Sequence, residues 1–341
     1  MEYVIIGFLW LAILLYLVLG GADFGAGIIE LFSTSTTRSR TRKAAYQAIG
    51  PIWEANHMWL IIAVVILFVG FPVIYSTMST YLHIPLVIML LGITARGTAF
   101  VFRNYDAVVD NMQTVYNRIF LYSSFITPLF LGIIAGSAVS GRVDPSATNF
   151  LDAYVFLWLN WFSVAIGLFT VALCGFLASI YLIGETNIKE DQQSFIRKAK
   201  IWNAIAVVCG ALVFIASMVE HIPLFTWILG NTVGLTAVIA ASLSLIVMWY
   251  LVSKGKTIVP RLLAGFQASM ILLAISYVHF PDFLIMKNGE HLSLFKHQAP
   301  DATMNALGWA LLIGSLFILP ALFYLYYSFQ KDRHAVSEVH G

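Results

Sequence analysis

Long apolar runs recur from one end of the chain to the other, separated by short polar segments. A helix needs about 20 apolar residues to cross a bilayer, so these runs predict transmembrane helices. Nine spans are expected, at residues 4–31, 52–76, 83–102, 118–140, 153–183, 201–220, 227–252, 261–285 and 303–329. The start of the seventh is the least sharply defined, because Pro223 and Gly230 interrupt it.

The composition points to the same class of protein. Of 341 residues, 60% are hydrophobic and 11% are charged, whereas roughly 25% of residues are charged in a typical soluble domain. The chain is therefore expected to be an all-α, polytopic membrane protein, with residues 1–341 forming a single transmembrane domain. Its surroundings are lipid, and no nucleic-acid partner is expected.

The distribution of basic residues predicts the orientation, because cytoplasmic loops carry an excess of Lys and Arg. The segments after the odd-numbered spans hold 15 of the 19 such residues, namely Arg38, Arg40, Arg42, Lys43, Arg103, Arg118, Lys189, Arg197, Lys198, Lys200, Lys254, Lys256, Arg261, Lys331 and Arg333. The opposite loops hold only Arg142, Lys287 and Lys296. The N-terminus is therefore expected outside and the C-terminus in the cytoplasm.

Neither the first apolar run nor the cysteines suggest processing or cross-linking. The run starts at Tyr3 with no basic residue before it and lacks a small-residue cleavage pattern, so it is expected to remain as a span. Cys174 and Cys209 lie inside apolar runs. We expect small buried side chains there rather than a disulfide or a metal pair.

Ionisable side chains inside spans are costly and usually face a protein interior or water. Asp23 lies in LGGADFGAG, in the half of the first span nearer the cytoplasm. The small residues around it let a second helix approach closely, so Asp23 is expected in a packed helix interface. It either has a function there or only hydrogen-bonds a neighbouring helix.

The stretch GPIWEANHMWL, at the cytoplasmic start of the second span, places Glu54, Asn56 and His57 between two tryptophans. A spacing of three residues puts Glu54 and His57 on one helix face, and the helix dipole favours a carboxylate near a helix N-terminus. The alternative is an interfacial belt, with Trp53 and Trp59 as anchors and Glu54 in water.

Arg96, in ITARGTAFVFR, lies deeper in the membrane than Arg103, seven residues later. Arg103 can extend to the cytoplasmic surface. Arg96 needs a carboxylate on a nearby helix, or an anionic group from a ligand or a second subunit. A structural ion pair and a functional role fit the sequence equally well.

The order of these motifs resembles subunit II of the cytochrome bd-type quinol oxidases, the respiratory terminal oxidases of bacteria and archaea. The resemblance rests on LGGADFGAG, GPIWEANHMWLI, RGTAFVFR and ATMNALGWALLIGSLFILPALFYLYY, in that order, together with nine spans and an external N-terminus. It covers nearly the whole chain. It implies two four-helix bundles plus one additional helix, in a bacterial cytoplasmic membrane.

The resemblance also implies partners and cofactors. This subunit would bind no haem or metal firmly and would form an obligate heterodimer with a subunit I of similar fold. That partner would carry two b-type haems, one d-type haem and the quinol-oxidising loop, so quinol and oxygen are substrates of the complex. Some members hold a structural quinone, and a small single-span subunit is a further candidate partner. Ubiquinol and menaquinol are equally compatible with this chain.

The family's site residues map onto this sequence with some changes. Asp23 matches the second acid of the first-span motif, and Gly20 replaces its first acid. Glu54 and Asn56 match the Asp and the Asn of a PxWDGNQVWL-like stretch, and His57 replaces its Gln. The resemblance thus implies a cytoplasmic proton route in which Glu54 takes up a proton and Asp23 relays it inward, while His57, Asn56 and bound water order the chain.

The remaining matches imply structural roles and no catalytic group in this subunit. Arg103 matches the basic residue that closes the third-span motif, and Asn117 stands where some members carry an acid, so no role is expected of it. Residues expected to support structure or assembly are Arg96, Arg103, Trp53 and Trp59.

Two other functions are compatible with parts of the sequence. A proton-coupled secondary transporter would use Asp23, Glu54 and Arg96, but it would also require two matched halves with broken helices. A membrane b-type cytochrome would use His57 as a haem ligand together with Met58, yet adjacent side chains on a helix project in different directions.

Overall fold

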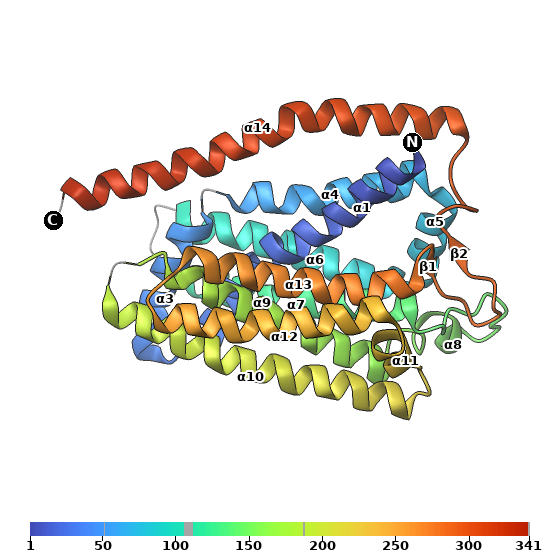
Figure 1. Ribbon diagram of the computed structural model, residues 1–341, viewed down its shortest axis with the longest axis horizontal. Helices are drawn as coiled ribbons and strands as arrows, with labels where there is room; N and C mark the ends of the chain where they lie inside the picture. The colour runs from blue at the N-terminus through green and yellow to red at the C-terminus, as the bar shows by residue number, and fades with distance from the viewer. Residues whose placement is uncertain (51, 106–111, 187, 340–341) are drawn as a thin grey trace.

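The computed structural model describes residues 1–50, 52–105, 112–186 and 188–339 (Figure 1). Within these ranges, nine helices are long and apolar enough to cross a membrane, which confirms the expected number of spans. They run side by side, with the N-terminus near one end of the molecule and the C-terminus at the other.

The first four spans form one bundle. Its elements are α1 (Glu2–Leu15), the π-helical turn η1 (Tyr16–Gly20), α2 (Gly21–Leu31), α4 (Trp53–Gly70), α6 (His83–Tyr105) and α7 (Met112–Val139). The helices α1, η1 and α2 together make the first span. Outside the bundle, α3 (Ser35–Ile49) joins α2 to α4, and α5 (Pro72–Tyr81) joins α4 to α6.

The next four spans form the second bundle, and a last helix lies apart. The bundle contains α9 (Trp161–Ile183), α10 (Lys189–Val219), α12 (Thr232–Ser253) and α13 (Ile258–His279). The short helices α8 (Phe150–Tyr154) and α11 (Leu224–Leu229) precede α9 and α12. Since α9 packs against α2, α7 and α10, it joins the bundles, whereas α14 (Asp301–Val339) packs on α1 and α4 (Figure 1).

The glycines of α2 explain why this helix lies so deep. A Cβ added at Gly25 would lie 1.9 Å from the Cys174 carbonyl oxygen of α9, and one at Gly27 would lie 2.3 Å from Ser124 Oγ of α7. No side chain fits at such distances. The small residues around Asp23 therefore allow close helix packing, as the sequence predicted.

The second and fifth spans are shorter than the apolar runs that predicted them. The run expected at 52–76 ends as a helix at Gly70, and α5 begins at Pro72, because proline has no N–H to donate but suits a first helical turn. The run expected at 153–183 becomes α9 only at Trp161. There the Asn160 side chain accepts a hydrogen bond from the Ser163 N–H and caps the helix.

The seventh and eighth spans also differ from their expected bounds. Asn231 accepts a hydrogen bond from the Gly234 N–H, so α12 begins at Thr232 and the residues before Gly230 form α11. The eighth span ends at His279 rather than at 285. Beyond it, β1 (Asp282–Leu284) and β2 (Leu292–Ser293) pair antiparallel at the end of the molecule that holds the N-terminus (Figure 1).

The strand end of the molecule carries a local ionic contact outside the spans. Lys287 Nζ lies 3.0 Å from Asp144 Oδ2, and Ser146 donates two hydrogen bonds to Oδ1 of the same carboxylate. The hydrogen bonds from Ser146, with the contact to Lys287, lower the pKa of Asp144 to about 2. This contact ties the segment after α7 to the strand segment.

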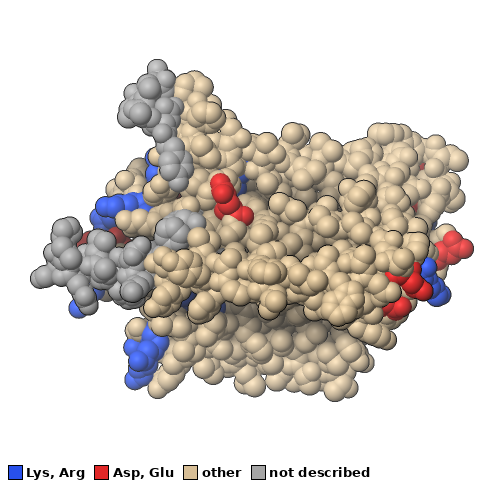
Figure 2. Space-filling model, turned by 90° about the horizontal axis from the view of Figure 1, so that it is seen from above, with Lys and Arg blue, Asp and Glu red and all other residues tan. Residues whose placement is uncertain are grey.

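Charged residues gather at the two ends of the molecule. Figure 2 shows most of the visible Lys and Arg at the left end, a mixture of acidic and basic residues at the right end, and a broad surface of other residues between them, with one acidic patch nearer the left end. Many large apolar side chains are exposed between the two ends, for example Ile61, Phe68 and Ile246. Such a surface suits the hydrocarbon region of a bilayer.

Candidate functional site

A buried polar cluster lies where α2, α4 and α6 meet. The side chain of Asp23 is 0% exposed and that of Arg96 is 1% exposed, and Arg96 Nη1 lies 3.8 Å from Asp23 Oδ2. His57 Nε2 lies 3.9 Å from the same oxygen. Asn56 is buried close to this carboxylate, and neither carboxylate oxygen of Asp23 receives a hydrogen bond within normal distance from a described residue. The structure thus brings together four residues that the sequence singled out.

Arg96 contacts three other groups of this cluster through its three guanidinium nitrogens. Its Nε donates to Ser124 Oγ at 3.1 Å, and its Nη2 donates to the backbone oxygen of Asp23 at 2.9 Å. Nη1 faces His57 Nε2 at 3.4 Å. Since guanidinium has only donors, Nε2 accepts in this geometry and the ring proton belongs on Nδ1. Arg96 therefore finds the intramembrane partner that the sequence required.

Aromatic rings enclose His57. The ring centroids of Tyr16, Phe24 and Trp53 lie 5.9, 5.4 and 6.3 Å from that of His57. Tyr16 belongs to the π-helical turn that joins α1 to α2, and π-helical turns are frequent at functional sites. These rings keep His57 close to Asp23 and leave little room for other groups around the imidazole.

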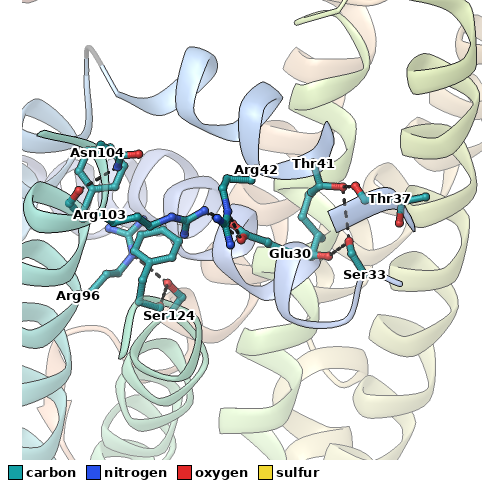
Figure 3. Close-up of polar contacts among 12 residues, drawn as sticks. Glu30, Ser33, Thr37, Thr41, Arg42, Arg96, Arg103, Asn104 and Ser124 are labelled. Atoms are coloured by element: carbon teal, nitrogen blue, oxygen red, sulfur yellow. Dashed lines mark hydrogen bonds and ion pairs between the residues drawn. The ribbon is translucent and has the colours of Figure 1, made fainter. Parts of the chain in front are cut away.

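A second acid lies nearer the C-terminal end of α2. Glu30 is 1% exposed. Arg103 Nη2 donates to its two oxygens at 2.9 and 2.7 Å, and Arg42 Nε donates at 3.0 Å. Figure 3 shows the Glu30 carboxylate directed towards both guanidinium groups. Arg103 was expected to extend to the cytoplasmic surface, but it lies buried because Glu30 provides a partner.

The two acids and the two arginines form a ladder between α2 and α6. Arg96 contacts Asp23 and Arg103 contacts Glu30, and both contacts join residues 73 positions apart in the chain. Phe120 of α7 lies between the rungs, with its ring centroid 5.1 Å from the Arg96 guanidinium carbon and 4.6 Å from that of Arg103. Cation–π contacts of this kind stabilise both arginines.

The other residues predicted for the site lie at its edge. Glu54 is exposed in the first turn of α4, three residues before His57. Trp53 packs on Phe100 with ring centroids 5.2 Å apart, and Trp59 is buried in the core of the first bundle. The tryptophans therefore pack within the protein, whereas Glu54 is available to solvent or to a partner.

Sequence reasoning missed Glu30, although a signal for it was present. Asp23 and Glu30 are seven residues apart, as are Arg96 and Arg103. Residues seven apart lie on about the same helix face two turns away. Equal spacing of acids on one span and of arginines on another therefore indicates two rungs rather than one.

The described residues do not gather a metal site. No group of three or more His, Cys, Asp or Glu side chains among them could hold a metal ion. His57 also fits an axial haem ligand poorly, because its Nε2 faces the Arg96 guanidinium and three rings surround it. Cys174 is buried and Cys209 is half-buried, and both are free.

Comparison with known proteins assigns the chain to a family. Residues 1–329 match the family of cytochrome bd terminal oxidase subunit II. The chain belongs to this family. It is 26% identical over 333 residues to the cytochrome bd ubiquinol oxidase subunit 2 of Bacillus subtilis, an alignment that covers 95% of each chain. The resemblance read from the motifs is therefore confirmed.

Two further matches to this bd oxidase subunit are one of sequence, over part of the chain, and one of fold, over nearly all of it. The cytochrome bd-I ubiquinol oxidase subunit 2 of Escherichia coli is 23% identical over 223 residues, which cover 62% of this chain and 57% of that protein. A chain of the bd oxidase from Geobacillus thermodenitrificans aligns with a TM-score of 0.74 at 20% identity, over 96% of this chain and 98% of that one. This match shows a common fold.

Subunit II of a bd oxidase is part of a quinol-oxidising, oxygen-reducing complex. Family membership and the nine spans together make this chain a multi-pass membrane subunit of such an oxidoreductase. Neither the family nor the fold supports a secondary transporter.

Proposed function

We propose that this subunit forms a heterodimer with a haem-bearing subunit I in the cytoplasmic membrane and supplies a cytoplasmic proton pathway for the reduction of oxygen to water. The observation that carries the proposal is the buried carboxylate of Asp23, which has His57 and Arg96 within 4 Å. A charged cluster at this depth is costly, and a fixed ion pair alone would favour shorter contacts.

The proposed route enters through Glu54 and ends at Asp23. Glu54 lies exposed in the first turn of α4, on the same face as His57 one turn later. A proton taken up by Glu54 passes to His57 and then to Asp23, and the Asn56 amide orients the carboxylate. Each group returns to its starting state when the proton moves on, so the relay consumes nothing.

Arg96 would position the relay rather than carry protons. Its three donor nitrogens hold Ser124, the Asp23 backbone and His57, and arginine stays protonated in proteins. It thereby fixes which imidazole nitrogen accepts and keeps the ring near Asp23. Arg103, Trp53 and Trp59 would support the bundle around this route and the assembly of the complex.

This subunit would bind no haem of its own. His57 is engaged by Arg96 and enclosed by rings, so the haems that the bd oxidase family requires belong on the partner subunit. Quinol oxidation, with proton release on the outer side, would also occur on the partner. The excess of Lys and Arg at one end of the molecule supports a cytoplasmic C-terminus and an external N-terminus (Figure 2).

The test is to replace Asp23→Asn and Glu54→Gln in the assembled complex. Removal of a positioned proton carrier lowers rates on the order of 10²-fold. We therefore expect quinol-driven oxygen consumption to fall strongly for Asp23→Asn and measurably for Glu54→Gln. The exposed Asp301→Asn serves as the matched control, because it removes an acid outside the proposed route.

A haem spectrum separates proton supply from assembly. Impaired proton delivery would leave the reduced-minus-oxidised haem spectrum as in the wild type but slow the turnover. A small weak acid added to the assay should then restore part of the rate of oxygen consumption. Unchanged turnover in both variants would refute the relay. Loss of haem together with turnover would assign Asp23 to assembly instead. A haem signal from this subunit purified alone would contradict the haem-free assignment.

A further inference from the structure

A groove opens between α2, α7, α9 and α10. Its volume is about 340 Å³. The walls are almost entirely apolar and include the rings of Phe32, Phe125 and Trp202, and the groove runs along α10 from Lys198 to Cys209. At 1.5 Å per residue this length of helix covers about 16 Å. Lys198 is the single ionic side chain among the described residues that line it.

Lys198 is held at the mouth of the groove by hydroxyl groups. Its Nζ donates to Ser33 Oγ at 2.9 Å and to Thr41 Oγ1 at 2.5 Å. Figure 3 shows Ser33 and Thr41 facing each other beside α10. Ser33 and Thr41 are buried, so these contacts link α10 to the end of α2 and to α3. The ammonium group is thereby fixed at the level where the apolar spans begin.

This cation forms no salt bridge in the described part of the chain, although the carboxylates of Glu30 and Asp191 lie near enough to attract it. No carboxylate oxygen there lies within 4 Å of Lys198 Nζ, whereas Glu190 and Asp191, near the start of α10, pair with Arg40 instead. An ammonium group carries three protons, and two of them are directed to Ser33 and Thr41. Nζ also lies 5.4 Å from the ring centroid of Phe195, which is a neutral cation–π partner, so none of these contacts neutralises the ammonium charge.

We propose that the groove binds an anionic glycerophospholipid, with its phosphate on Lys198 and one acyl chain along α10. The apolar walls suit a hydrocarbon chain, and an unpaired cation at the polar end suits a phosphodiester. Arg38, whose Nη2 donates to the Ser33 backbone oxygen at 3.2 Å, adds positive charge near Lys198. A head group with net negative charge is therefore favoured over a zwitterionic one.

The bound lipid would stabilise the contact between the two helix bundles. The groove walls come from α2 and α7 of the first bundle and from α9 and α10 of the second. An acyl chain between Phe125 and Trp202 contacts both sides, and the head group reaches α3 through Lys198. Bound lipid should therefore raise the thermal stability of the complex in detergent.

The test measures lipid retention by native mass spectrometry of the whole complex, delipidated and then supplied with phosphatidylglycerol or phosphatidylcholine. Attraction of an anionic lipid to one lysine is worth roughly fivefold in binding. We expect the wild type to retain about fivefold more phosphatidylglycerol, and Lys198→Gln to lose this preference. Lys200→Gln is the matched control, because Lys200 is exposed and does not line the groove.

A second variant tests the apolar part without touching the cation. Cys209→Phe fills the far end of the groove and should lower retention of both lipids, while the thermal unfolding midpoint without lipid shows that the protein is folded. Equal retention of the two lipids by the wild type, or an unchanged preference in Lys198→Gln, would overturn the proposal. So would retention of a neutral quinone in place of phospholipid, or equal stabilisation by inorganic phosphate alone.

Discussion

Two acids on one helix are held in different ways. Glu30 receives hydrogen bonds of 2.7 to 3.0 Å from Arg103 and Arg42, whereas Asp23 meets the ring of His57 and the guanidinium of Arg96 only at 3.9 and 3.8 Å. Short, multiple contacts fix an ion pair. Longer contacts to a group that can accept or release a proton suit a relay. These contacts suit Glu30 to a structural role and Asp23 to the proposed proton relay.

The role of Glu30 predicts a large loss of stability on Glu30→Gln. The substitution leaves Arg103 buried without a counter-charge, and breaking a buried pair in this way costs about 3–5 kcal/mol. Thermal unfolding of the complex should show a lower midpoint. Glu190→Gln is the matched control, because its partner Arg40 is exposed and surface pairs contribute little. Equal effects of the two changes would disprove the structural role.

At this scale the sequence identified most of the candidate cluster. Burial cost and helix phase were enough to select Asp23, His57 and Arg96, because an ionisable group within a span needs a partner. The equal seven-residue spacing of the acids and of the arginines indicates two pairs, but which side chains meet depends on which helices are neighbours, and the sequence does not show that. Arg103 was expected to reach water at the end of its span, and the structure instead places it beside Glu30 with its side chain buried.

Close packing of α2 is the main feature at the scale of helices. The helix touches α7 and α9 through glycines, so its position tolerates no added side chain on those faces. This packing holds Asp23 and Glu30 opposite α6. The close approach of helices thus sets the geometry of the ladder.

Gly25→Ala should disrupt this packing, while Gly7→Ala should not. The added methyl group at Gly25 would overlap the Cys174 carbonyl, and overpacking of this kind costs about 1–3 kcal/mol or more. At Gly7 a Cβ meets no atom within 4 Å, although both glycines belong to the first span. The measurement is the yield and unfolding midpoint of the assembled complex. Comparable losses for the two variants would contradict the packing argument.

The positions of helices were predicted better than their ends. A hydropathy average detects only the length of an apolar run. The run that contains α4 extends through Phe71 into α5, although the helix is interrupted at Pro72. The average likewise cannot distinguish the apolar residues before Asn160 from the helix that Asn160 caps. A helix cap or a proline break depends on one or two residues. A mean hydropathy taken over about 20 residues does not detect it.

Considered as a whole, the molecule places its charges at two ends and its apolar side chains between them (Figure 2). The alternation of basic loops predicted this arrangement, because each of nine crossings reverses the side on which a loop lies. The fold class and number of spans were therefore available from the sequence. The arrangement into two bundles with α14 apart was implied only by resemblance to the family.

The orientation can be tested with single cysteines. In a Cys209→Ser background, Asn288→Cys should react with a membrane-impermeant maleimide added to intact cells, whereas Lys256→Cys should react only after the cells are opened. Both positions are exposed and lie at opposite ends of the molecule. The buried Cys174 provides no background reaction. The reverse labelling pattern would place the N-terminus in the cytoplasm.

The ladder also constrains how the chain can vary between relatives. Because its two rungs join partners with the same separation of 73 residues, one insertion or deletion inside α2 or α6 between the rungs would misalign one pair while preserving the other. A change of length in α3 or α5 alters both separations together and leaves both pairs intact. Differences in length among related proteins should therefore occur in the connecting helices α3 and α5. They should be absent from residues 23–30 of α2 and 96–103 of α6.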